Sequence, residues 1–157
     1  MFAKPQAEHQ WLERFVGNWS FEHDCKMPDG STTKTPGKLQ CRSLGGLWLI
    51  CESSGASDDG GQWSSIMTVG FDPAKGHYVG TFVGSMMTHL WQYQGVVDAS
   101  GKRLPLNCEG PRFDGNGTCP YRDTIEIVDN DTWLLISELQ GDDGNWVKFM
   151  TGTHTRA

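Results

Sequence analysis

The residues best suited to chemistry lie in a segment rich in aromatic and sulfur-containing side chains, residues 86–97. If this segment is a strand, one of its faces carries Met87, His89, Trp91 and Tyr93. That face has more aromatic bulk than the other, and strand side chains alternate between faces, so we expect it to point into the protein. A histidine among apolar neighbours could carry a proton or hold a ligand. It could equally be a core histidine bonded to a carbonyl oxygen.

Two glutamates, Glu52 and Glu138, each follow an apolar run late in a predicted strand. A carboxylate that points inward loses its hydration and needs a partner. Arg42 and Arg122 are suitable partners, since each lies beside apolar neighbours in a strand. Such a pair is more often structural than catalytic. With His89 as the base, Glu52 or Glu138 would complete a general acid–base pair, which is the enzyme alternative.

Other catalytic and metal-binding patterns are missing from the sequence. It contains no G-x-S-x-G nucleophile motif, and its five cysteines include no C-x-x-C pair. We expect these cysteines to be reduced, with several of them small core residues. The sequence therefore predicts no metal and no cofactor.

The overall charge and hydropathy pattern narrows the choice of partners. The net charge is −6, with acidic residues spread through many turns, so nucleic acid is not an expected partner. The longest apolar stretches fall far short of the ~20 residues that a membrane-spanning helix needs. The first residues lack the features of a secretory signal. We therefore expect a cytoplasmic location and no membrane association.

The chain is predicted to form one short helix followed by strands. Trp11, Leu12, Phe15 and Val16 fall on one face of a helix over residues 6–15. From Trp19 onward the apolar period changes to two. Turn sequences recur from Pro28-Asp29-Gly30 to Gly141-Asp-Asp-Gly144 and separate about nine or ten strands. The predicted strands cover residues 18–26, 37–43, 47–55, 63–71, 77–84, 86–97, 103–109, 121–128, 132–139 and 146–155.

Closure of these strands into a single antiparallel β-barrel is the economical arrangement. An open meander of nine or ten strands would leave two long edges unpaired. We expect an all-β fold with one domain over residues 1–157, in which residues 1–16 form a cap and residues 17–156 a calycin-like or lipocalin-like barrel. The last strand should pair with the first, and the helix should cover one end.

The order of short motifs along the chain resembles a known bacterial family. These motifs are EHQWL at residues 8–12, VGNW at 16–19, RSLGGLW at 42–48, GFDP at 70–73, YVG at 78–80 and GTHTR at 152–156. The family is domain of unknown function 1579, and the likeness covers nearly the whole chain. The resemblance implies a calycin-like, lipocalin-type barrel and no established activity.

A second resemblance concerns haem. The G-x-W sequence at residues 17–19 is similar to the opening of nitrobindin-like barrels, which hold haem through a histidine near the C-terminus. His154 lies in the last predicted strand, where such a ligand could sit. Simple alternation puts His154 on the same face as Lys148, which favours the outer face. We therefore expect no haem binding and keep a haem-binding barrel as an alternative.

The leading hypothesis is a binding barrel for a small, mostly apolar ligand. The candidate ligand-binding residues are Trp11, Glu52, Tyr78, His89, Trp91, Arg122, Glu138 and His154. Outward aromatics could also form a homodimer contact, for which Trp63 and Trp146 are the candidates.

Overall fold

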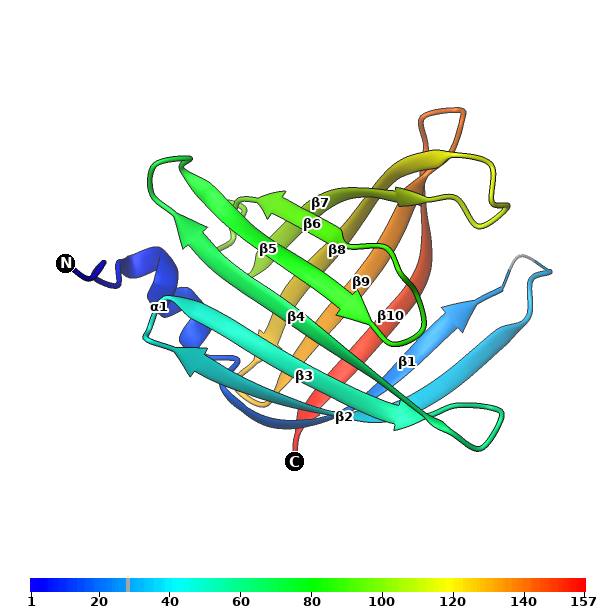
Figure 1. Ribbon diagram of the computed structural model, residues 1–157, viewed down its shortest axis with the longest axis horizontal. Coiled ribbons are helices and arrows are strands. Elements are labelled where there is room, and N and C mark those ends of the chain that lie inside the picture. The colour runs from blue at the N-terminus through cyan, green and yellow to red at the C-terminus, as the bar shows by residue number, and fades with distance from the viewer. Residues whose placement is uncertain (28) are drawn as a thin grey trace.

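The computed structural model describes residues 1–27 and 29–157, which form a closed antiparallel barrel of ten strands with one short helix (Figure 1). Pro28, in the predicted turn before the second strand, lies outside the described residues. The helix is α1 Ala7–Glu13. The strands are β1 Gly17–Lys26, β2 Thr32–Leu44, β3 Trp48–Ala56, β4 Gln62–Asp72, β5 His77–Gly84, β6 Trp91–Gly95, β7 Arg103–Pro111, β8 Thr118–Asp129, β9 Thr132–Gln140 and β10 Trp146–Arg156.

Each strand pairs with its neighbours in the sequence, and β1 also pairs with β10. The predicted barrel and the predicted closure between the first and last strands are therefore confirmed. The turn between β2 and β3 contains Gly45 and Gly46 at φ angles of 66° and 72°. Because L residues rarely adopt such angles, this glycine pair reverses the chain instead of bending one long strand.

β6 is much shorter than the predicted strand over residues 86–97. Residues 85–90 form a turn and an irregular segment, in which the amide of Met87 donates to the carbonyl of Gly84. The period-two prediction for His89 therefore fails, because His89 precedes the strand. Between β6 and β7 the ladder is reduced to the pair Gln94–Asn107. The barrel wall is weakest at this seam.

β10 contains a register shift between Lys148 and Met150. Before the shift, Lys148 lies opposite Glu138 on the outer face; after it, Met150 lies opposite Ser137 on the inner face. One extra residue in a strand reverses the alternation beyond it. The prediction that His154 faces outward with Lys148 is therefore wrong, and His154 points into the barrel with only 3% of its surface exposed.

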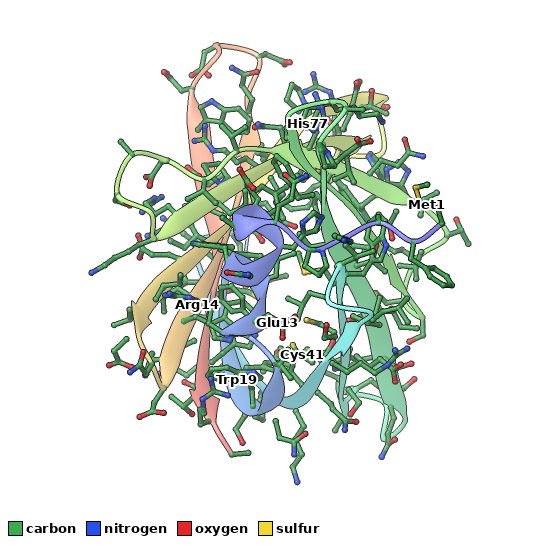
Figure 2. All side chains as sticks on the ribbon, turned by 90° about the vertical axis from the view of Figure 1, so that its left-hand side faces the viewer. Met1, Glu13, Arg14, Trp19, Cys41 and His77 are labelled. Carbon is green, nitrogen blue, oxygen red and sulfur yellow. The ribbon has the colours of Figure 1, made fainter. Side chains whose placement is uncertain are left out.

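Helix α1 lies across one end of the barrel, as Figures 1 and 2 show. The Nε2–H of His9 donates to the carbonyl of Phe71 (3.0 Å), since its Nδ1 already accepts from the amide of Gln6 (2.9 Å). Tyr78 donates its hydroxyl to the carbonyl of Glu8 at 2.6 Å. Trp11 donates its indole N–H to the carbonyl of Gly101 at 2.8 Å. These bonds tie a helix too short to be stable alone to three separate parts of the barrel.

Beneath α1 the barrel is filled. The apolar side chains that pack there are all buried and come from the helix and most of the strands: Leu12, Phe15, Trp19, Leu39, Cys41, Leu49, Cys51, Val69, Tyr78, Leu104, Leu106, Ile125, Ile127 and Trp133. We call this region the capped half, and the rest of the interior, toward the opposite end, the open half.

Candidate ligand-binding site

Inward-facing glycines in the open half lie beneath aromatic rings of neighbouring strands. The four ring–glycine pairs are Phe21 over Gly37, Trp63 over Gly55, Trp91 over Gly110 and His23 over Gly152. A Cβ atom at Gly110 would come within 2.1 Å of the Trp91 ring, and one at Gly55 within 2.7 Å of the Trp63 ring. Because the glycines have no side chain, the rings can lie against the wall and leave the centre of the barrel free.

Several inward-facing side chains of the open half keep solvent-accessible surface although they lie inside the barrel. They are His23, Phe82, Asp123, Leu135 and Met150. Asp123 is the charged member of this set, and it is partly exposed although it faces inward. In a filled core such residues would be fully covered, as they are in the capped half. These exposed fractions indicate that solvent reaches part of the inward side chains in the open half.

Two histidines form the boundary between the halves. The His154 ring stacks on Trp133, with centroids 3.8 Å apart and an angle of 7° between the planes, and its centroid lies 6.2 Å from that of His23. Burial lowers the pKa of His23 to about 4. Burial, together with the nearby His23, lowers the pKa of His154 to about 3. Both imidazoles are therefore neutral at pH 7.

A second polar group in the open half centres on Asp123. The hydroxyl of Tyr93 donates to Oδ2 of Asp123 at 2.5 Å, and the hydroxyl of Ser137 also bonds to this carboxyl. Burial raises the pKa of Asp123, while these two hydroxyls oppose the increase. The pKa of Cys108 rises to about 12, first through burial and then through the charge of Asp123.

The seam between β6 and β7 contains a cavity of about 780 Å³ in the barrel wall. Its lining includes Lys75, His77, His89, Asn107 and Glu109. Tyr93, whose hydroxyl bonds to Asp123, also lines this cavity. A smaller cavity of about 250 Å³ lies at the capped end, beside Phe15, Trp19 and Trp133.

Two predicted site residues, Trp11 and Tyr78, lie in the capped half. Both side chains use their polar atoms to hold α1 against the barrel. Their rings also pack together, with centroids 6.0 Å apart. In this position they stabilise the cap.

Of the pair at the centre of the sequence prediction, Trp91 points into the barrel and His89 does not lie on a strand. The Nε2 atom of His89 bonds to the carbonyl oxygen of Glu109 at 2.9 Å. The His89 ring meets Trp91 edge-on, with centroids 4.7 Å apart and an interplanar angle of 86°. His89 therefore contacts the open half through Trp91.

Arg122 and Glu138, which the sequence named among the possible partners of an inward pair, do form an ion pair at 3.2 Å, but it lies on the outer face of the barrel. The guanidinium group of Arg122 also covers the ring of Trp146 at 4.1 Å. Glu52 is exposed on the outer face of β3. Neither glutamate meets His89, so the acid–base pair of the enzyme alternative is not formed by these residues.

Trp63 and Trp146, the two tryptophans expected to face outward and form a homodimer contact, lie in different surroundings. Trp63 is directed inward over Gly55 and packs against the core, while Trp146 is covered in part by Arg122. They do not form one outward apolar patch.

The inward position of His154 prompts a test of whether haem fits. Its Nδ1 atom is fully covered and has no hydrogen-bond partner. Trp133 stacks on the ring, and Phe21 packs against it with centroids 5.3 Å apart. Iron ligation needs open space in the plane of the imidazole beside the ligating nitrogen. The surroundings of Nδ1 provide none, so this nitrogen does not fit haem ligation.

Sequence reasoning missed His23, Tyr93 and Asp123 as site residues. Asp123 alternates with Tyr121 and Ile125 on a face that is otherwise apolar. A single acidic residue on an otherwise apolar strand face indicates a candidate site residue, since burying its carboxylate is costly without a partner. The partners themselves come from other strands and could not be read from the sequence.

The family model for Protein of unknown function (DUF1579) matches residues 4–156. The chain belongs to this family. The resemblance noted in the sequence is thereby confirmed, and the family description assigns no activity. No curated protein matches the chain.

Several solved structures share the barrel. Rv2717c from M. tuberculosis matches with a TM-score of 0.71 and 13% identity, covering 98% of this chain and 99% of that one. The S-type phycobiliprotein lyase CPES from Guillardia theta matches with a TM-score of 0.61 and 13% identity over 98% of each chain. A redesigned β-barrel matches with a TM-score of 0.50 and 12% identity over 98% of this chain and 99% of that one. At these identities the likeness concerns the fold alone.

In the described part of the chain, no helix has the length and apolar character needed to cross a membrane. No group of three or more histidine, cysteine, aspartate or glutamate side chains there could hold a metal ion.

Proposed function

We propose that this protein binds a small, mostly apolar and planar molecule in the open half of its barrel. The observation that carries the proposal is the set of inward side chains in the open half that keep solvent-accessible surface beside flat aromatic rings. Trp63 and Trp91 lie along the wall over Gly55 and Gly110. A planar ligand could stack on such rings and gain the free energy of removing apolar surface from water.

The polar groups in the open half support binding with a defined orientation. Small-molecule sites are mostly apolar and contain a few polar groups that select and orient the ligand. Here those groups are the neutral His23 and the Tyr93–Asp123–Ser137 network. His154 and Phe21 form the floor beneath them, at the boundary with the capped half. His89 supports the site through the edge of Trp91.

The proposal is tested with N-phenyl-1-naphthylamine, a neutral aromatic probe whose fluorescence rises in apolar surroundings. We expect saturable binding to the purified protein. Trp91→Ala should weaken binding by about tenfold, since an aromatic contact and its buried area are lost. Native mass spectrometry of the purified protein should, in addition, reveal any molecule that copurifies.

The chain offers a matched control in Trp48→Ala. Trp48 also lies over a glycine, Gly70, but on the outer face of the barrel, where it is 40% exposed. This variant removes the same side chain from the opposite face and should bind the probe as the unaltered protein does. Equal loss in both variants, or no saturable binding at all, would contradict a site inside the barrel.

Haem binding was the alternative suggested by the position of His154. Because the whole His154 side chain is buried and Trp133 stacks on its ring, we expect that titration with hemin produces no sharp Soret band that depends on His154. A band that disappears in His154→Ala would replace the proposal above with a haem-binding function.

A further inference from the structure

Among the described strand residues that face inward, one charged side chain lies between the two ends of the barrel, and it is Asp123. Arg156 lies in register with the inner face only at the capped end, where its guanidinium group covers Trp19 at 4.2 Å and donates to the carbonyls of Val16 and Arg14. The guanidinium group of Arg156 therefore binds groups at the capped end.

The partners of Asp123 are neutral. Tyr93 and Ser137 supply hydroxyl groups, and the described cations form their ion pairs with other carboxylates. A carboxylate held in the interior without a cation loses hydration that two hydroxyl groups replace only in part. The raised pKa of Asp123, which burial causes, is the expected consequence.

Asp123 keeps solvent-accessible surface although it faces the interior of the barrel. It can therefore be reached by a molecule in the open half. The aromatic rings of Trp63 and Trp91 belong to that half, and aromatic faces attract cations. The carboxyl group of Asp123 and the aromatic wall both favour a positively charged ligand.

We propose that the ligand of the open half is a planar aromatic molecule with a basic nitrogen, which is protonated and donates an N–H group to Asp123. This inference rests on the proposed function and adds the charge class of the ligand. Such a ligand supplies the cation that the carboxylate lacks. A carboxylic acid of the same shape would bring a second negative charge into the interior and bind poorly.

The test compares three planar probes of similar size: 9-aminoacridine, which is cationic at neutral pH, the neutral 9-hydroxymethylanthracene and the anionic 9-anthracenecarboxylate. Each is titrated while tryptophan fluorescence is recorded. We expect the cation to bind most tightly, about ten- to a hundredfold better than the neutral probe, as for hydrogen bonds to charged groups. The anion should bind most weakly.

Three variants assign the preference to Asp123. Asp123→Asn should remove the preference for the cation, so that the affinities of the cationic and the neutral probe come within about threefold of each other. Glu52→Gln removes the same charge from the exposed outer face and should leave the preference intact, which controls for attraction to the acidic surface. Tyr93→Phe keeps the carboxylate and frees it from a competing donor, so the preference for the cation should persist even if Asp123→Asn fails to fold.

The outcomes separate this inference from the function on which it rests. If the neutral probe binds but the cation gains nothing, or if Glu52→Gln abolishes the preference as Asp123→Asn does, the role of Asp123 is wrong and the binding barrel stands. If no probe binds inside the barrel, both fall. Loss of the preference in Tyr93→Phe, with the fold intact by circular dichroism, would also contradict the inference.

Discussion

The capped and open halves of the barrel are built from the same strands but filled differently. In the capped half, residues such as Leu104 and Val69 have no exposed surface, and α1 is held over them by hydrogen bonds. In the open half, glycines occupy inward positions, and the rings of Trp63 and Trp91 lie against the wall. Large inward side chains fill a barrel of this size, whereas inward glycines leave it partly empty. One end of the barrel thus provides stability and the other provides space.

The largest expected effect is on the stability that the capped half supplies. Phe15→Ala should lower the free energy of unfolding by about 3–5 kcal/mol, because it removes a buried ring that packs against Trp11 and Trp133. Phe82→Ala, in the open half, should lower it by about 1–2 kcal/mol, because Phe82 is only half-buried. Urea denaturation followed by circular dichroism measures both. Equal losses would show that the halves are packed alike.

The two neutral histidines should make the protein sensitive to mild acid. Their pKa values in the folded state are about 4 for His23 and about 3 for His154, against 6.5 in the unfolded chain. Below pH 6.5 the unfolded state takes up protons that the folded state does not, until the pH reaches the folded pKa. The free energy of unfolding should therefore fall between pH 6.5 and about pH 4, by at most about 1.4 kcal/mol per pH unit for each histidine.

Urea denaturation at a series of pH values measures this slope. His154→Phe, which keeps a ring over Trp133, should reduce it. Trp48→Ala, which removes a non-titrating side chain from the outer face, is the control and should leave the slope unchanged. A slope that is the same in all three proteins would show that His154 is not held neutral by the fold.

A smaller effect is expected from filling the space beneath a flat ring. In Gly110→Ala the new Cβ would lie 2.1 Å from the Trp91 ring, so the ring must move into the barrel. We expect a loss of about 1–3 kcal/mol in the free energy of unfolding and weaker binding of N-phenyl-1-naphthylamine. Gly61→Ala, in a loop where the nearest atom is a flexible Asp59 oxygen at 3.2 Å, should change neither. Unaltered probe affinity in Gly110→Ala would mean that Trp91 does not line the site.

The smallest effect is expected at His89. Its imidazole supports Trp91 from the edge and is bonded to a carbonyl oxygen, so His89→Ala should weaken probe binding by about two- to threefold. The fold should remain intact. His77→Ala removes a histidine from the same wall cavity without touching Trp91 and serves as the control. A tenfold or greater loss in His89→Ala would instead place its imidazole in direct contact with the ligand.

The sequence by itself determined the architecture of the protein. Period-two alternation and regularly spaced turns predicted the ten strands, and the apolar face of residues 6–15 predicted the helix that became α1. The turns have this predictive strength because glycine adopts φ angles that other residues avoid, as at Gly45 and Gly46. Such information is local, so it can be read without the folded structure.

Only the tertiary structure decided which residues form the candidate site. A single bulge at Phe149 brought His154 inside, although simple alternation placed it outside. The strand predicted over residues 86–97 begins only at Trp91, so His89 lies before it. Asp123 became a candidate site residue because the hydroxyl of Tyr93, on another strand, donates to its carboxyl group. Bulges, strand ends and contacts between distant strands depend on how the sheet closes, and that closure is a property of the whole chain.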